Sequence, residues 1–158
     1  MSGPGRLSRF AATLSADRRR AEHRPADLDG AIPIQSDADI VSARQEGRRL
    51  AEDLGFTGSD LTVIATAISE LTRNILQYAG RGAVTLEPIA NGGHAGIRVT
   101  ARDEGPGIPD MTQALTVGYS TSGGLGLGLP GVRRLVDTFD LTSEPGRGTV
   151  VTVIKWKR

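Results

Sequence analysis

The chain has 158 residues, of which 38% are hydrophobic and only 4% aromatic, so it suits a single domain with a mainly aliphatic core. Its 19 basic and 18 acidic residues leave a net charge of +1, which excludes a global field that would attract nucleic acid or a membrane. The absence of cysteine excludes disulfides, and no apolar run approaches the roughly 20 residues of a spanning helix. We therefore expect a cytoplasmic protein with no nucleic-acid or membrane partner.

The first thirty residues are rich in arginine and poor in β-branched residues, which argues against a core of their own. We expect residues 1–30 to form a mobile Arg-rich arm ahead of one domain at 31–158. Two other interpretations of the arm are open. An apolar helical spacing between Leu7 and Leu14 would allow a short docking helix, and the Arg- and Ser-containing composition has features of a transit peptide.

The ordered part is expected to begin with a short strand at 31–36, whose Pro33 favours the edge of a sheet. Ser36 and Asp39 then form a capping-box-like start for an amphipathic helix that ends at Gly55. Apolar residues at spacings of three and four predict a second helix, which begins near Ser59 and stops around residues 79 and 80. These elements give the order strand, helix, helix.

Two segments with alternating apolar and polar residues, 83–89 and 96–102, predict strands joined by a hairpin turn at "NGGH". After a glycine-, serine- and threonine-containing region at 105–128, we expect a helix over 130–138. Strands at 139–143 and 149–156, joined by "EPGRG", complete the chain. Helices followed by hairpin strands favour an α+β two-layer sandwich, with a mixed or mainly antiparallel sheet covered by helices on one face.

The second predicted helix carries a polar pair within "ISELTRNILQYAG". Glu70 and Asn74 are four residues apart, so they lie on one helix face and a carboxylate and a carboxamide can reach one site. A solvated helix face that also includes Arg73 is the other interpretation of this pair.

A glycine-containing turn, "DEGPGI", follows the predicted strand at 96–102 directly. Gly105 and Gly107 allow a close approach of the backbone and positive φ angles. Asp103, at the end of the strand, could accept a hydrogen bond from an exocyclic amine such as that of adenine. The alternative is an ordinary turn in which Asp103 bonds its own backbone.

The stretch "STSGGLGLGLPGV", residues 120–132, alternates glycine with leucine just before a predicted helix. Gly124, Gly126 and Gly128 would let successive backbone N–H groups face an anion, and a helix starting near Pro130 would add its positive end. This arrangement suits phosphate. A flexible linker is the alternative, although linkers rarely continue straight into a helix.

The same stretch contains "GLGLPG", a literal match to the dinucleotide fingerprint G-x-G-x-x-G. A Rossmann-type nicotinamide site is therefore open, with Glu144 in about the place of a ribose-binding acid. It lacks a hydrophobic strand before the first glycine and leaves the other two features unexplained. A Walker loop is excluded because no Lys-Ser or Lys-Thr pair follows the glycines.

Taken together, "ELTRN", "DEGPGI", "GGLGLGLPGV" and a later "GRGT" resemble the N-box, the two glycine boxes and the terminal threonine of the GHKL superfamily of Bergerat-fold ATP-binding proteins. Their order and spacing agree from about Ile32 to the C-terminus. With "ARQEG" and "GYSTSGGLGLGLPGVRRLVDTF", the detail resembles the serine/threonine switch kinases of bacterial stressosome partner-switching systems. The resemblance implies a Bergerat-type, histidine-kinase-like ATPase fold that binds ATP and Mg²⁺.

The resemblance also implies roles for individual residues. Asn74 would coordinate the Mg²⁺ ion that bridges the ATP phosphates, and Glu70 would position or deprotonate the attacking hydroxyl. Asp103 would bind the adenine amine with support from Thr149, while Arg73 is either a phosphate contact or a surface arginine. The remaining implied contacts are the base pocket at Gly105 and Gly107, the phosphate contacts at Gly124, Gly126 and Gly128, and the lid hydroxyls of Ser120, Thr121 and Ser122.

The function implied is that of an ATP-dependent protein serine/threonine kinase, which transfers the γ-phosphate to a STAS-domain antagonist or scaffold. When released, it would bind and activate a PP2C-type phosphatase, and a homo-oligomer is compatible with this role. The alternative is an anti-sigma factor that sequesters a sigma subunit through the same ATP-binding fold. His23 and His94 are expected to be exposed and incidental, since neither has a metal-ligand or catalytic companion at a suitable spacing.

Overall fold

The computed structural model describes residues 30–107 and 128–158. The helices and strands follow the predicted order. In chain order they are β1 (Ala31–Ile34), α2 (Asp37–Asp53), α3 (Ser59–Ala79), β2 (Gly82–Asn91), β3 (His94–Asp103), α5 (Gly128–Leu135), β4 (Thr138–Glu144) and β5 (Gly148–Trp156). Apart from Gly30, the predicted arm lies outside the described residues, and so does the part of the glycine-rich region at 108–127.

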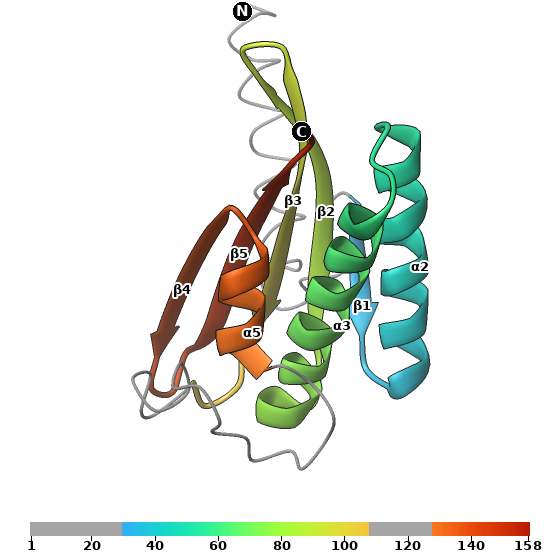
Figure 1. Cartoon of the computed structure of the whole chain (residues 1–158). Coiled ribbons are helices and arrows are strands. Elements are labelled where there is room, and N and C mark those ends of the chain that lie inside the picture. Colours follow the sequence, from blue (N-terminus) through green and yellow to red (C-terminus); the bar gives the residue numbers. More distant parts are fainter. Residues whose placement is uncertain (1–29, 108–127) are drawn as a thin grey trace, which may run out of the picture.

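The described strands form one five-stranded sheet in the order β1-β2-β3-β5-β4. The predicted sheet was mixed or mainly antiparallel, and all four pairings between these strands are antiparallel. Helices α2, α3 and α5 lie on one face of the sheet, as predicted for a two-layer α+β sandwich (Figure 1). Strand β1 lies at the sheet edge, the position that Pro33 predicts, because proline cannot donate a ladder hydrogen bond.

The boundaries of the first two helices agree with their capping signals. The backbone N–H of Ser36 donates to the Asp39 carboxylate at 3.1 Å, so the capping box orders the start of α2. Helix α3 ends at Gly80, whose φ of 81° is left-handed and whose N–H donates to the carbonyls of Ile75 and Leu76. Local hydrogen-bonding chemistry therefore sets these ends.

Several boundaries differ from the prediction, and β1 ends at Ile34 rather than at residue 36. The strands β2 and β3 extend to Asn91 and His94, because Gly92 and Gly93 both have positive φ and close a two-residue turn of the kind that matches strand twist. Helix α5 occupies Gly128–Leu135 rather than 130–138. It ends early because the N–H of Asp137 donates to the carbonyl of Ile154, which commits the chain to the sheet.

The core lies between the helices and the sheet and is almost wholly aliphatic. None of the helices within residues 30–107 and 128–158 has the length and apolarity needed to cross a membrane. The largest fully buried side chains are Phe56, Ile34, Ile64, Ile68, Leu71, Ile75, Ile97, Val84, Val99, Val132, Val151 and Val153.

Helices α2 and α3 pack closely against each other at Gly47. A Cβ atom at this position would lie 2.0 Å from Cδ1 of Ile68, which is fully buried. Replacing Gly47 with alanine is expected to lower the free energy of unfolding by about 1 kcal/mol, because overpacking costs about 1–3 kcal/mol and better helix propensity returns up to about 1 kcal/mol. Urea denaturation measures this change.

Ile68→Val provides the control for this prediction, because it removes the Cδ1 atom that the new methyl group would meet. In a double-mutant cycle, the combined variant should be more stable than the sum of the two single changes. Strict additivity, or a Gly47→Ala variant that is more stable than the wild type, would contradict the packing explanation.

Candidate functional site

The described residues of the turn "DEGPGI" and the β4–β5 turn that precedes Thr149 meet at the end of the sheet where β3 finishes (Figure 1). The turn after β3 lies against the end of α3, since a Cβ at Gly105 would be 2.5 Å from Cβ of Ala79. It also lies against the β4–β5 turn, where the N–H of Gly146 donates to the carbonyl of Pro106 at 2.8 Å. Helix α5 begins beside α3, so segments distant in sequence are close in space.

Glu70 is buried near the start of α5, with only 9% of its surface exposed. Its Oε2 accepts a hydrogen bond from Nη1 of Arg73 at 2.9 Å, and its Oε1 accepts one from the N–H of Gly128 at 3.2 Å. The interpretation of this face as merely solvated is therefore wrong for Glu70. Asn74, one turn further along α3, is half-buried on the same face.

Arg73 is partly exposed and its guanidinium forms an ion pair with Glu70. A contact between Arg73 and phosphate, which the sequence resemblance implies, stays a prediction. The observed ion pair gives Arg73 another role in the structure. It orients the carboxylate of Glu70, which lies three residues earlier on the same helix.

Asp103 ends strand β3 as a buried carboxyl group, 4% exposed. Burial raises the pKa of Asp103 above its ordinary value of 3.8, although hydrogen bonds from the backbone N–H groups of Gly105 and Thr149 partly oppose this. The bond from Gly105 to Oδ1 is 2.9 Å long, so Asp103 does close its own turn. That bond leaves acceptor capacity on the carboxyl group for a ligand amine.

Thr149 lies directly opposite Asp103 on β5 and is 3% exposed. Its hydroxyl oxygen is 2.8 Å from the hydroxyl oxygen of Ser143 on β4, which also contacts the carbonyl of Gly148. Sequence reasoning missed Ser143. The signal that identifies it is its register with Thr149, which becomes visible only when the pairing of β4 with β5 is known.

Gly107 and Gly148 have a packing reason to be glycine, as has Gly105. A Cβ at Gly107, where φ is +84°, would lie 2.5 Å from the carbonyl oxygen of Glu144. At Gly148, where φ is +116°, it would lie 2.2 Å from the carbonyl oxygen of Asp103. These close approaches hold the turn after β3 against the β4–β5 turn, and a role of Gly105 and Gly107 in shaping a base pocket stays a prediction.

Gly128 is the one predicted phosphate-contacting glycine among the described residues. It has a φ of +68° and begins α5, so its N–H belongs to the positive end of a helix. The other predicted contacts of the glycine-rich stretch lie outside the described residues, namely Ser120, Thr121, Ser122, Gly124 and Gly126.

The donor atoms near Glu70 suit a magnesium ion that is shared with a phosphorylated ligand. No group of three or more His, Cys, Asp or Glu side chains in the described part of the chain could form a cage for a metal ion. Mg²⁺ prefers oxygen ligands and is commonly held by one or two protein side chains together with substrate phosphates. The carboxamide oxygen of Asn74 is such a ligand, and it lies on the same face of α3 as Glu70, one turn away.

Comparison with known proteins identifies the class. Residues 59–158, more than half of the chain, match the family described as histidine kinase-, DNA gyrase B-, and HSP90-like ATPase. The chain therefore belongs to this ATPase family, and the predicted superfamily is confirmed. Membership implies that the nucleotide is ATP, and it removes the support for a nicotinamide site.

Among individual proteins, the chain is similar to the serine/threonine-protein kinase RsbT of Bacillus subtilis, at 52% identity over 127 residues, covering 80% of this chain and 96% of that protein. The predicted resemblance to serine/threonine switch kinases is thereby confirmed. The anti-sigma F factor of Geobacillus stearothermophilus is 30% identical, covering 72% of this chain and 87% of that protein. A solved structure, the mycobacterial sensor histidine kinase MprB, aligns at 22% identity and a TM-score of 0.47, covering 80% and 97% of the two chains.

Proposed function

We propose that this chain is an ATP-dependent protein serine/threonine kinase that acts as a partner-switching regulator. The observation that carries the proposal is the buried carboxylate of Glu70, held at the start of α5 in an ATPase-family chain that is 52% identical to a serine/threonine-protein kinase. A carboxylate at this place can accept a proton from an attacking hydroxyl.

In this proposal the nucleotide is held at both of its ends. Asp103 accepts a hydrogen bond from the adenine amine, with Thr149 supporting the base pocket that Gly105 and Gly107 shape. Asn74 coordinates Mg²⁺, which neutralises charge on the phosphates when it is bound. The remaining phosphate contacts are Arg73, the backbone N–H groups of Gly124, Gly126 and Gly128, and the hydroxyls of Ser120, Thr121 and Ser122.

The proposed reaction is a direct phosphoryl transfer. The hydroxyl oxygen of a serine or threonine in the partner forms a bond to the γ-phosphorus, while the bond between that phosphorus and the β–γ bridging oxygen breaks and ADP leaves. The hydroxyl proton passes to the carboxylate of Glu70. Its two observed hydrogen bonds occupy only part of the four lone-pair positions of the carboxylate, so it can accept this proton while Arg73 orients it.

The proposed phosphoacceptor is a STAS-domain antagonist or scaffold, and the proposed second partner is a PP2C-type phosphatase that the released kinase activates. The similarity to RsbT supports partners of this type. A homo-oligomer is compatible with the proposal, and the net charge of +1 gives no support for a nucleic-acid or membrane partner.

A transfer assay tests this function. The full chain is incubated with γ-labelled ATP, magnesium and a STAS-domain protein from the same cell, and label is expected on a serine or threonine of that protein only when magnesium is present. ATP binding is measured in parallel by calorimetry. If ATP binds and no label moves to any STAS-domain candidate, the kinase proposal is overturned.

The alternative is an anti-sigma factor, favoured by the similarity to anti-sigma F factors at 28–32% identity. Affinity purification of the chain from its source cell, with and without ATP, separates the two functions. Recovery of a phosphatase or a STAS-domain scaffold supports the switch kinase. Recovery of a sigma subunit supports the anti-sigma function.

A further inference from the structure

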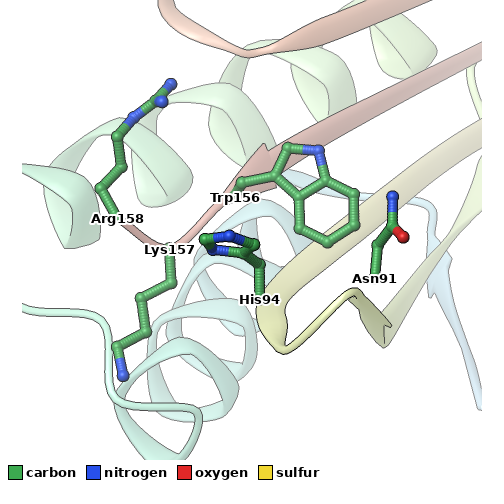
Figure 2. A pocket seen from close by; sticks show the side chains of 5 residues that line it. All are labelled: Asn91, His94, Trp156, Lys157 and Arg158. Atoms are coloured by element: carbon green, nitrogen blue, oxygen red, sulfur yellow. The ribbon is translucent and has the colours of Figure 1, made fainter.

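A pocket lies at the opposite end of the sheet from Asp103. Its volume is about 400 Å³, and the residues that line it are Asn91, His94, Trp156, Lys157 and Arg158 (Figure 2). Strand β3 runs for 10 residues from His94 at this pocket to Asp103, so the two places are about 30 Å apart at about 3.3 Å per residue. The pocket is therefore separate from the proposed nucleotide site.

Trp156 forms one wall of this pocket, on the sheet face opposite helices α2, α3 and α5. It pairs with Gly96, and a Cβ at Gly96 would lie 2.6 Å from Cε3 of the indole, so the six-membered ring covers the glycine. The ring is thus packed on the backbone on one side, as in sheets where an aromatic side chain shields a cross-strand glycine. Its half-buried state leaves indole surface available to a ligand.

The β2–β3 hairpin places the polar wall of the pocket. Asn91 and His94 are the last pair of the ladder, and the two-residue turn of Gly92 and Gly93 closes it directly. By strand alternation, both side chains lie on the same face of the sheet as Trp156, opposite α2, α3 and α5. His94 is exposed, as predicted, but the pocket gives it neighbours that the sequence analysis did not foresee.

Cationic side chains outnumber acidic ones around the end of β5. The Nζ atom of Lys155 lies 3.9 Å from Oδ1 of Asp60 and 3.9 Å from Oδ2 of Asp137, and Arg158 also pairs with Asp137. Lys157 has no acidic partner among the ion pairs of the described residues, and its Nζ atom lies near Gly55 instead. Lys155 and Arg158 thus share two carboxylates, and Lys157 adds a further positive charge. The side chains of Lys157 and Arg158 extend from the pocket in different directions (Figure 2).

We propose that this pocket docks an acidic segment of a partner protein. One aromatic side chain of the segment stacks on Trp156, and carboxylates on either side of it in sequence pair with Lys157 and Arg158. Tryptophan and arginine are typical of residues that dominate protein interfaces. The divergence of the two cationic side chains favours an extended chain with separated carboxylates over a free nucleotide, whose negative charge is concentrated on its phosphates.

The docking proposal is independent of the proposed kinase function. Because the pocket and Asp103 lie at opposite ends of β3, a partner segment can bind while the nucleotide site is in use. Loss of ATP binding would leave the docking site intact, and loss of docking would leave ATP binding intact. Separate titrations with ATP and with a peptide therefore distinguish failure of one proposal from failure of the other.

The chain contains a single tryptophan, so intrinsic tryptophan fluorescence reports on this pocket alone. The full chain is titrated with the capped peptide Glu-Glu-Phe-Glu-Glu, and we expect a saturable change with a dissociation constant of about 1 mM or tighter. Glu-Glu-Ala-Glu-Glu should bind at least about tenfold more weakly, and Lys-Lys-Phe-Lys-Lys should give no saturable change. Absence of a saturable change with Glu-Glu-Phe-Glu-Glu would overturn the proposal.

Two variants and a control localise the binding. Arg158→Glu and His94→Ala should each weaken peptide binding at least about threefold, the former more at low salt. Arg48→Glu reverses an exposed charge on α2 outside the pocket and should leave binding unchanged. If adenosine monophosphate gives the saturable change and displaces the peptide, the pocket is a nucleotide site and the docking proposal is wrong.

Discussion

Replacing Glu70 with glutamine is expected to reduce phosphoryl transfer by about 10²- to 10⁴-fold, which is the usual contribution of a general base. Glutamine keeps the size of the side chain and an oxygen that can accept the N–H of Gly128, so ATP should still bind. What it loses is the ability to take the proton from the attacking hydroxyl. The measurement is initial-rate transfer to the STAS-domain substrate, together with calorimetric titration of ATP.

Glu87→Gln is the matched control, because Glu87 is a partly exposed carboxylate on β2 that pairs with Arg98 outside the proposed site. This variant should transfer phosphate at the wild-type rate. Urea denaturation of both variants separates lost folding from lost chemistry. Full transfer activity in Glu70→Gln would remove Glu70 as the base, whereas parallel loss of ATP affinity would assign it to binding.

Replacing Asp103 with asparagine is expected to weaken ATP binding by roughly 10- to 100-fold, because a hydrogen bond to a charged acceptor contributes about 1.5–3 kcal/mol. The asparagine oxygen can retain the bond from Gly105, but its NH₂ group then turns a donor toward the amine of adenine. The ratio of the affinity for ATP to the affinity for GTP should fall as well. Titration of both nucleotides against the variant measures these two effects.

The Asp103→Asn substitution, although it weakens ATP binding, should not lower the free energy of unfolding. Because burial raises the pKa of Asp103, the folded chain binds this proton more tightly than the unfolded chain, and the ionised carboxyl group lowers the free energy of unfolding at neutral pH. Asparagine removes that penalty, so the variant should be at least as stable as the wild type near pH 7. Its advantage should shrink as the pH falls and should vanish below 3.8, where Asp103 is protonated in both states.

Asp140→Asn, at an exposed position on β4, is the control for this pair of effects and should change neither property. If Asp103→Asn binds ATP with wild-type affinity, Asp103 does not contact adenine. Reduced stability at neutral pH would show that the carboxylate is needed for the fold, and the loss of ATP binding would then have a structural cause.

Most of the fold could be predicted because local patterns and long-range packing agree. Ser36 and Asp39 order the start of α2, Gly80 ends α3, and the alternation on either side of the Gly92–Gly93 turn specifies a hairpin. The end of α5 could not be predicted in this way. It depends on a hydrogen bond from Asp137 to Ile154, a strand residue that follows it by more than a dozen positions.

The candidate site was predictable as a set of residues rather than as an arrangement. The spacing of Glu70 and Asn74 placed them on one face, but a solvated face has the same spacing. Burial of Glu70 required the N-terminus of α5 beside it, and the role of Ser143 required its register with Thr149. Both depend on contacts across long stretches of sequence.

The sequence by itself determined the order of elements, the ATPase family and the residues that form its motifs, because periodicity, capping and motif spacing are local properties of the chain. The tertiary structure alone decided which polar groups are buried and paired, because burial depends on the elements that pack against a residue. It brought the carboxylate of Glu70 to the N–H of Gly128 and raised the pKa of Asp103. It also joined Asn91, His94 and Trp156 into a pocket at the far end of the sheet.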